Sequence, residues 1–155
     1  QKYDAIEHVS EEAVQYGTTR VIPKGNLIVS TRMGLGRAFI SMVDMAINQD
    51  MKGIILDNNL VSTEFVYFSY VQLHNRLERL GNGSTVKGID VQTLKKLEIN
   101  LPPLPEQTAI AEILSAVDRE IDLHEKHLKE LKKQRQALMQ LLLTGIVRVN
   151  GQEVS

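Results

Sequence analysis

A regular spacing of apolar residues between Ile110 and Leu142 constrains this chain more than any other feature of its sequence. Steps of four and three residues alternate over more than four heptads, and this average period of 3.5 is typical of a coiled-coil seam. The ten seam positions, eight of them aliphatic, are Ile110, Leu114, Val117, Ile121, His124, Leu128, Leu131, Arg135, Leu138 and Leu142. The sequence therefore predicts one long helix built to pair with another helix.

The charges along this predicted helix indicate the direction of its partner. We expect the helix to run from Pro105, which suits a first helical position, to about Thr144, where Gly145 favours termination. Acidic residues predominate as far as Glu125, and basic residues predominate from Lys126 onward. A parallel copy would place like charges side by side, whereas an antiparallel helix of similar sequence places the acidic half beside the basic half. We therefore predict an antiparallel partner helix.

The chain before this helix contains short β-favouring runs separated by turn residues. The runs that predict strands are 21–22, 27–29, 38–40, 53–56 and 97–101. An amphipathic helix over 62–80, with Ser62 or Thr63 as its N-cap, is expected to cover the resulting sheet. Asp90 is expected to cap a short helix that ends near Lys96. After the long helix, residues 146–149 again have the composition of a strand.

A proline-rich segment, 102–105, marks a domain boundary because proline disfavours both a central strand and a helix interior. We predict an α+β protein in which a small mixed β-sheet domain with a covering helix occupies residues 1–104. A long coiled-coil helix follows over 105–145, and a C-terminal tail over 146–155. Because Gln1 opens on sequence that reads like the middle of a domain, we expect this domain to be incomplete at its start.

The composition excludes several classes of protein. The absence of cysteine excludes disulfide frameworks and thiolate metal sites. No apolar run approaches the roughly 18 residues of a membrane span, and no signal peptide opens the chain, so we predict a cytoplasmic protein. The net charge of −1 gives no global attraction to nucleic acid, but residues 20–52 hold five basic and two acidic residues. This segment forms either a local basic face or ordinary solvated surface.

No motif in the sequence indicates catalysis or metal binding. His124 and His127 are three residues apart on the predicted helix, but no third ligand converges on them. The Gly34-Leu35-Gly36 run lacks the third glycine of a dinucleotide-binding turn. No nucleophile elbow and no phosphate-binding loop occurs. We therefore assign no catalytic residue, no metal ligand and no cofactor site to this chain.

Two segments in the second half of the chain carry a family resemblance. Gly-Ser-Thr-Val-Lys-Gly-Ile at 83–89 and Leu-Pro-Pro-Leu-Pro-Glu-Gln at 101–107 resemble the specificity subunit of type I restriction-modification systems. Residues 21–29, 36–38 and 48–49 are similar to pieces of that family's target recognition domain, so the resemblance covers roughly residues 15–149. The family subunit usually carries two recognition domains and two long helices. This chain resembles one half.

The resemblance implies a non-catalytic subunit of a methyltransferase and endonuclease complex. Such a subunit binds one half of a bipartite double-stranded DNA target. Its helix pairs with a second copy or with the other half of the subunit, and this pairing sets the distance between the two halves of the target. Methyltransferase (M) and restriction (R) subunits would dock around it, and S-adenosylmethionine would belong to the M subunit. The alternative is a coiled-coil assembly or scaffold protein without DNA preference. A stand-alone nuclease or methyltransferase is disfavoured by the missing motifs.

Polar and basic residues on the predicted loops are the candidates for DNA contact. Arginine suits guanine edges and phosphates, asparagine and glutamine suit adenine, and serine, threonine and lysine mostly position the backbone. The candidates are Thr31, Arg32, Arg37, Asn48, Gln49, Lys52, Ser84, Thr85 and Lys87. Each of them could instead serve turn structure.

Overall fold

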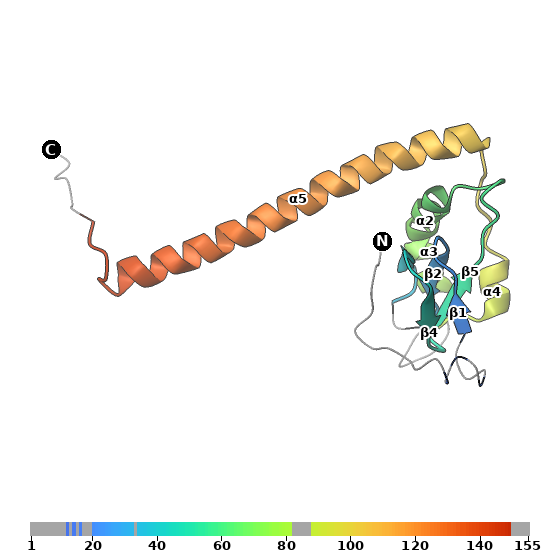
Figure 1. Ribbon diagram of the computed structural model, residues 1–155, viewed down its shortest axis with the longest axis horizontal. Helices are drawn as coiled ribbons and strands as arrows, with labels where there is room; N and C mark the ends of the chain where they lie inside the picture. The colour runs from blue at the N-terminus through green and yellow to red at the C-terminus, as the bar shows by residue number, and fades with distance from the viewer. Residues whose placement is uncertain are drawn as a thin grey trace. The chain divides into compact units, whose positions relative to one another are not determined.

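The computed structural model describes residues 12, 14, 16, 20–32, 34–81 and 88–149. The chain divides into two compact units, residues 1–112 and residues 113–155. The first unit holds the strands, the helices α2 to α4 and the first turns of α5 (Figure 1). The second unit holds the rest of α5 and the segment after it.

Five short strands form two small sheets in the first unit. One sheet pairs β1 (Arg20–Ile22) with β4 (Met45–Ile47). The other has the order β3-β2-β5, with β2 at Leu27–Ser30, β3 at Ala38–Ile40 and β5 at Met51–Ile54. The predicted α+β class is confirmed. The prediction of a mixed sheet is wrong for the described residues, where every strand pairing is antiparallel.

The strand β2 is the centre of the core because both of its faces are buried. Leu27 and Val29 belong to the larger cluster, which α2 covers with Val66 and Tyr70. Ile28 points to the opposite face and joins a smaller cluster with residues of β1 and β4. This alternation follows from the two-residue period of side chains along a strand. The three-stranded sheet therefore lies between α2 and the β1-β4 pair.

Two predicted helices are present, each with the predicted cap. The helix α2 (Thr63–Gln72) begins after Ser62, whose hydroxyl accepts from the Phe65 N–H at 3.3 Å. A break at Leu73 separates it from α3 (His74–Leu80), so the prediction of one continuous helix is wrong at that residue. The helix α4 (Val91–Lys95) begins after Asp90. The Thr93 backbone N–H donates to Asp90 at 2.6 Å, and this bond lowers the pKa of the Asp90 carboxyl.

Two predicted strands are not strands in the structure. Residues 97–101 form no ladder, although Leu97 and Ile99 pack on the larger core cluster. Alternate burial is therefore present there without strand pairing. Residues 146–149 also form no strand.

The helix α5 (Leu104–Leu143) spans 40 residues, which is about 60 Å at 1.5 Å per residue. It starts one residue before the predicted Pro105 and ends one before the predicted Thr144. Gly145 follows with a φ of 75°, a backbone conformation that glycine adopts readily. None of the helices in the described ranges is long and apolar enough to cross a membrane.

A buried side chain joins the first turns of α5 to the preceding structure. Gln107 is 1% exposed. Its Oε1 accepts from the Ser62 backbone N–H at 3.0 Å, and its Nε2 donates to the carbonyls of Pro102 at 2.8 Å and Leu60 at 3.4 Å. Near the start of α5, Gln107 and Ala111 are the buried residues, whereas Ala109 is exposed.

The hydroxyl of Tyr70 is a testable weak point of the core. Tyr70 is 2% exposed, and its hydroxyl has no hydrogen-bond partner among the described residues. Because an unpaired buried polar group costs roughly 1–3 kcal/mol, we expect Tyr70→Phe to raise the free energy of unfolding at pH 7 by about 1 kcal/mol. Urea titration followed by circular dichroism measures this. Tyr16→Phe, which removes an exposed hydroxyl, is the control and should leave the value unchanged.

The same variant has an expected pH dependence. Burial raises the pKa of Tyr70 to about 12, whereas an unfolded tyrosine ionises near pH 10. The unfolded chain therefore loses this proton first, and the free energy of unfolding falls between about pH 10 and about pH 12. The free energy of unfolding of the Tyr70→Phe variant should lack this part of the decline with pH. Equal declines in the parent protein and the variant would contradict the assignment.

Candidate nucleic-acid interface

Six of the predicted DNA-binding residues gather at one end of the three-stranded sheet. Because β2 is antiparallel to both neighbours, its last residue meets the starts of β3 and β5. Ser30 pairs with Met51, and the Ser30 N–H donates to the Arg37 carbonyl at 2.9 Å. Residues 31–32, Arg37 and residues 48–52 are therefore neighbours, although the sequence separates them by up to 21 positions.

Thr31 and Asn48 fix the turn between β4 and β5. The Thr31 N–H and hydroxyl both donate to the Asp50 carbonyl, at 2.8 Å and 3.1 Å. The Asn48 Oδ1 accepts from the Asp50 N–H at 3.1 Å. Thr31 is 3% exposed, so its side chain positions the turn and is not itself on the surface. Asn48 is exposed.

Arg32 is an exposed cation beside this turn. Its Nη1 lies 3.4 Å from the Asp50 Oδ1, and its backbone bridges to Gly88. The Ile89 N–H donates to the Thr31 carbonyl at 3.0 Å, so residues 88–89 also lie at this sheet end. The predicted candidates Ser84, Thr85 and Lys87 lie outside the described residues.

Lys52 and Gln49 complete the β4-β5 turn. The Lys52 ammonium group donates to the carbonyls of Gln49 at 2.8 Å and Met51 at 3.0 Å, so the lysine folds back on its own turn. Gln49 is exposed. The turn therefore displays the amides of Asn48 and Gln49 beside the Asp50 carboxylate, and the lysine charge lies close to the main chain.

Arg37 is exposed at the end of the glycine turn 34–36. A Cβ on Gly36 would lie 2.6 Å from the His74 Cα, and the Gly36 φ is 82°, so this position requires glycine. The His74 Nδ1 lies 2.7 Å from the Leu35 carbonyl and donates to it, because a carbonyl can only accept. The helix α3 thus holds the turn from which Arg37 projects.

The sequence reasoning missed Asp50 at this site. Asp50 organises the turn through its backbone and neutralises part of the Arg32 charge through its carboxylate. Its place two residues after Asn48 is a turn signal, but the contact with Arg32 is visible only in the fold. In the described residues no three histidine, aspartate or glutamate side chains come together as a metal site.

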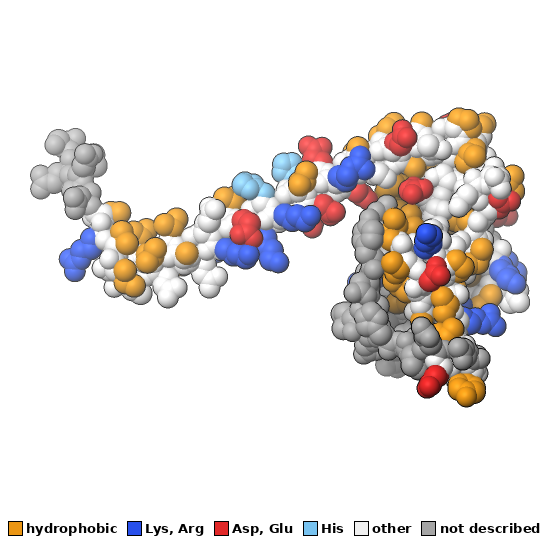
Figure 2. All heavy atoms as spheres, in the orientation of Figure 1, with side chains coloured by type: hydrophobic (Ala, Val, Ile, Leu, Met, Phe, Trp, Pro, Cys, Tyr) orange, Lys and Arg blue, Asp and Glu red, His pale blue; other side chains and the backbone are white. Residues whose placement is uncertain are grey.

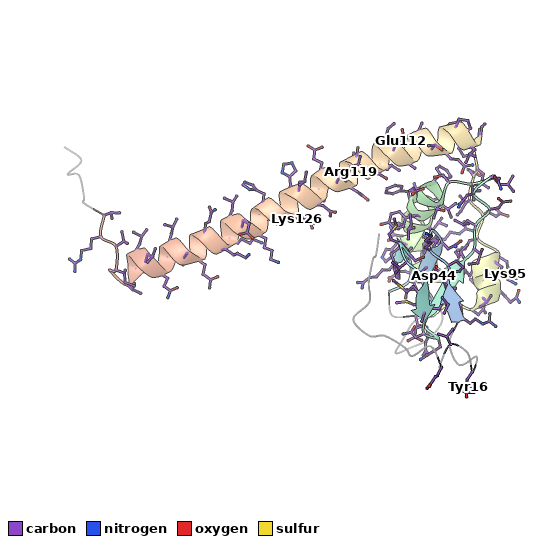
Figure 3. The ribbon with its side chains drawn as sticks, viewed as in Figure 1. Tyr16, Asp44, Lys95, Glu112, Arg119 and Lys126 are labelled. Atoms are coloured by element: carbon purple, nitrogen blue, oxygen red, sulfur yellow. The ribbon has the colours of Figure 1, made fainter. Side chains whose placement is uncertain are left out.

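The helix α5 presents a second candidate surface. Nearly all of the predicted seam residues are exposed there, for example Leu114 at 38%, Ile121 at 49% and Leu128 at 51%. Ile110, near the start of the helix, is half-buried. Figure 3 labels Glu112, Arg119 and Lys126, three residues spaced seven apart along α5. An exposed apolar seam of this length is a surface for another helix.

The comparisons with known proteins identify the family. Residues 1–133 match the type I restriction modification DNA specificity domain. This chain belongs to that family.

Relatives with assigned names agree with the family. The chain is 32% identical over 130 residues to the putative type I restriction enzyme MjaX specificity subunit of Methanocaldococcus jannaschii, which covers 84% of this chain and 31% of that subunit. It is 30% identical to the MjaIX specificity subunit of the same organism, over 81% of this chain and 29% of the relative. The chain thus spans about a third of the length of these relatives.

Solved structures show the same fold. The type I restriction-modification S subunit from M. genitalium superposes with a TM-score of 0.64 at 24% identity, over 77% of this chain and 32% of that one. The HsdS subunit from Thermoanaerobacter tengcongensis superposes with a TM-score of 0.60 at 19% identity, over 78% of this chain and 30% of that one. The predicted family and the fold of a small sheet with a long C-terminal helix are confirmed.

Proposed function

We propose that this chain reads one half of a bipartite double-stranded DNA target as part of a type I specificity subunit. The observation that supports this most directly is the gathering of Arg32, Arg37, Asn48, Gln49 and Lys52 at one sheet end in a chain of this family. Exposed arginines suit phosphates and guanine edges, and exposed amides suit adenine. The chain itself would be non-catalytic, and the M subunit would hold S-adenosylmethionine.

The Arg32-Asp50 ion pair suits a DNA-binding site in which the arginine leaves the carboxylate when DNA binds. The two side chains are 54% and 31% exposed, and a pair so exposed to solvent stabilises the fold only slightly. The guanidinium can therefore turn from the carboxylate to DNA at little cost. The carboxylate also repels phosphate when Arg32 is not aligned, which disfavours nonspecific binding.

In the same proposal α5 sets the distance between two readers by pairing antiparallel. The partner helix comes from a second copy or from the other half of a longer subunit. A register with Ile110 opposite Leu142 centres the pair at Lys126 and sets Glu120 level with Lys132. The M and R subunits would dock on this assembly.

Selection of bound DNA tests the function. The chain is combined with its M subunit, and fragments are recovered from a random duplex pool and sequenced. We expect one enriched half-site, repeated in inverted orientation at a fixed spacing when two copies pair. The absence of any enriched half-site would reject the proposal and favour the scaffold alternative, which predicts assembly without DNA preference.

The variant Asp50→Asn tests the role of the ion pair. It removes the charge beside Arg32 and preserves the side-chain shape. We expect roughly three- to tenfold tighter binding to nonspecific duplex, and a salt dependence steeper by up to about 0.9 in the log-log slope, as for one additional phosphate contact. Fluorescence anisotropy at several salt concentrations measures both.

The matched control is Asp44→Asn. Asp44 precedes β4, at the other end of that strand from the turn, and accepts from the Lys24 backbone N–H at 2.9 Å. The Asp44→Asn variant should leave the log-log slope of DNA binding against salt concentration unchanged. Equal effects of the two variants would show that only net charge matters and would remove Arg32-Asp50 from the proposed interface.

A further inference from the structure

The last turns of α5 are apolar on several sides of the helix. Leu138 and Leu142 belong to the seam, but Met139, Leu141 and Leu143 lie off it and are 50%, 38% and 79% exposed. We call residues 138–143 the apolar tip. Figure 2 shows hydrophobic side chains gathered on this end of the helix.

The middle of the helix has a different surface. Between Val117 and Ala137 every residue off the seam is polar or charged except Leu123, which is 66% exposed. A two-stranded coiled coil buries mainly its seam, so the middle of α5 needs nothing beyond one partner helix. The apolar tip carries additional apolar surface that such a pairing leaves in water.

A second apolar surface lies beside the first turns of α5. Leu60 and Leu101 are 68% and 55% exposed. The Gln107 amide donates to the carbonyls of Leu60 and Pro102, which places both segments next to the start of the helix within the first compact unit. Ala109 is also exposed there. We call Leu60, Leu101 and Ala109 the helix base.

The charge order of α5 indicates what covers these two surfaces. Residues up to 125 are mainly acidic and those from 126 mainly basic, so the helix is complementary to a reversed copy of itself. In the register that pairs Ile110 with Leu142, residues 138–143 of one copy lie level with residues 109–114 of the other. The apolar tip then reaches the segment of the partner helix that adjoins the helix base.

We infer that the apolar tip of each copy docks on the helix base of the second copy. This inference rests on the antiparallel pairing in the proposed function and adds to it a contact between the end of one helix and the globular unit of the partner. An antiparallel pair contains two such contacts. The off-seam side chains Met139 and Leu143 would pack against Leu60 and Leu101.

Cross-linking tests the contact directly, because the chain has no cysteine of its own. Single variants Leu60→Cys and Leu143→Cys are mixed at a concentration where the chain is dimeric and treated with a short bis-maleimide. We expect cross-linked dimer from the mixture and none from either variant alone, since like positions lie at opposite ends of an antiparallel pair. Leu123→Cys, mixed with Leu60→Cys, is the matched control and should give no product.

A second measurement uses a charge at the same positions. Leu143→Asp should raise the dissociation constant of the dimer by about 100-fold or more, because it removes a buried leucine from each of two contacts. Leu123→Asp, an equally drastic change at an exposed off-seam leucine, should change it less than about twofold by the same reasoning. Sedimentation equilibrium gives both constants.

The outcomes separate this inference from the pairing on which it rests. A dimer that forms normally, gives no 60–143 cross-link and responds equally to the two aspartates would overturn the docking of the tip and leave the antiparallel seam intact. A chain that stays monomeric at high concentration would overturn this inference together with the pairing of two copies. A 60–143 cross-link together with the selective effect of Leu143→Asp supports the inference.

Discussion

Replacing Leu128 by aspartate is expected to abolish self-association of this chain at micromolar concentration. Leu128 is a seam residue near the middle of α5 and is 51% exposed in the single chain. In the register that pairs Ile110 with Leu142, the new carboxylate of each copy would lie level with His124 of the other helix and next to the apolar seam. Taking two carboxylates out of water costs several kcal/mol in total even beside a histidine, so the dissociation constant should rise by more than about 100-fold. Sedimentation equilibrium over a range of concentrations measures the change.

The control is Lys129→Asp, which adds the same side chain one residue along and off the seam. Its effect should be far smaller and should decline with added salt, because it acts through screened surface charges. If Leu128→Asp associates as tightly as the parent chain, the seam is not the pairing surface.

Replacing Gln107 by leucine is expected to lower the free energy of unfolding by about 3 kcal/mol. The side chain is buried, and the leucine would leave the Ser62 N–H and the Pro102 carbonyl without their partner. Each buried group left unpaired costs about 1–3 kcal/mol. Urea titration followed by circular dichroism, at one fixed protein concentration, measures the loss.

Gln72→Leu is the matched control because Gln72 is exposed at the end of α2. It should change the free energy of unfolding by less than about 0.5 kcal/mol, as surface substitutions usually do. A Gln107→Leu variant as stable as the parent would mean that water replaces the lost hydrogen bonds and that the amide does not hold the start of α5.

The features that sequence could predict are those with a local cause. The length of the helix α5 follows from its apolar period, and the caps at Ser62 and Asp90 follow from oxygen-bearing side chains placed before helical residues. The strands at 21–22, 27–29 and 38–40 were each bounded by turn residues, and they are present as β1, β2 and β3. For all of these, the chain within a few residues contains the whole signal.

Other elements depend on partners that are distant in sequence. The strand β4 was not predicted because only Ile47 among its three residues has a strong strand preference, and it exists through its pairing with β1. The strand β5 begins at Met51, two residues before the predicted start, since Met51 pairs with Ser30. Residues 97–101 alternate like a strand, but no neighbouring strand pairs with them.

The candidate site shows the same division. Arg32, Arg37 and Lys52 could be found from composition because residues 20–52 are locally basic. Asp50 could not, since its importance comes from lying 3.4 Å from a side chain 18 positions earlier. Gln107 stood in the proline-rich segment of the family resemblance, but its burial required contacts with Ser62 and Leu60, about 45 residues away.

The Gln107 contacts have a consequence for how such chains can diversify. All three of its partners, on Ser62, Leu60 and Pro102, are main-chain atoms. A set of hydrogen-bond partners made of main-chain atoms does not depend on the identity of the surrounding side chains. Any globular unit whose backbone follows the same path could therefore accept the same helix without a compensating side-chain change at the joint.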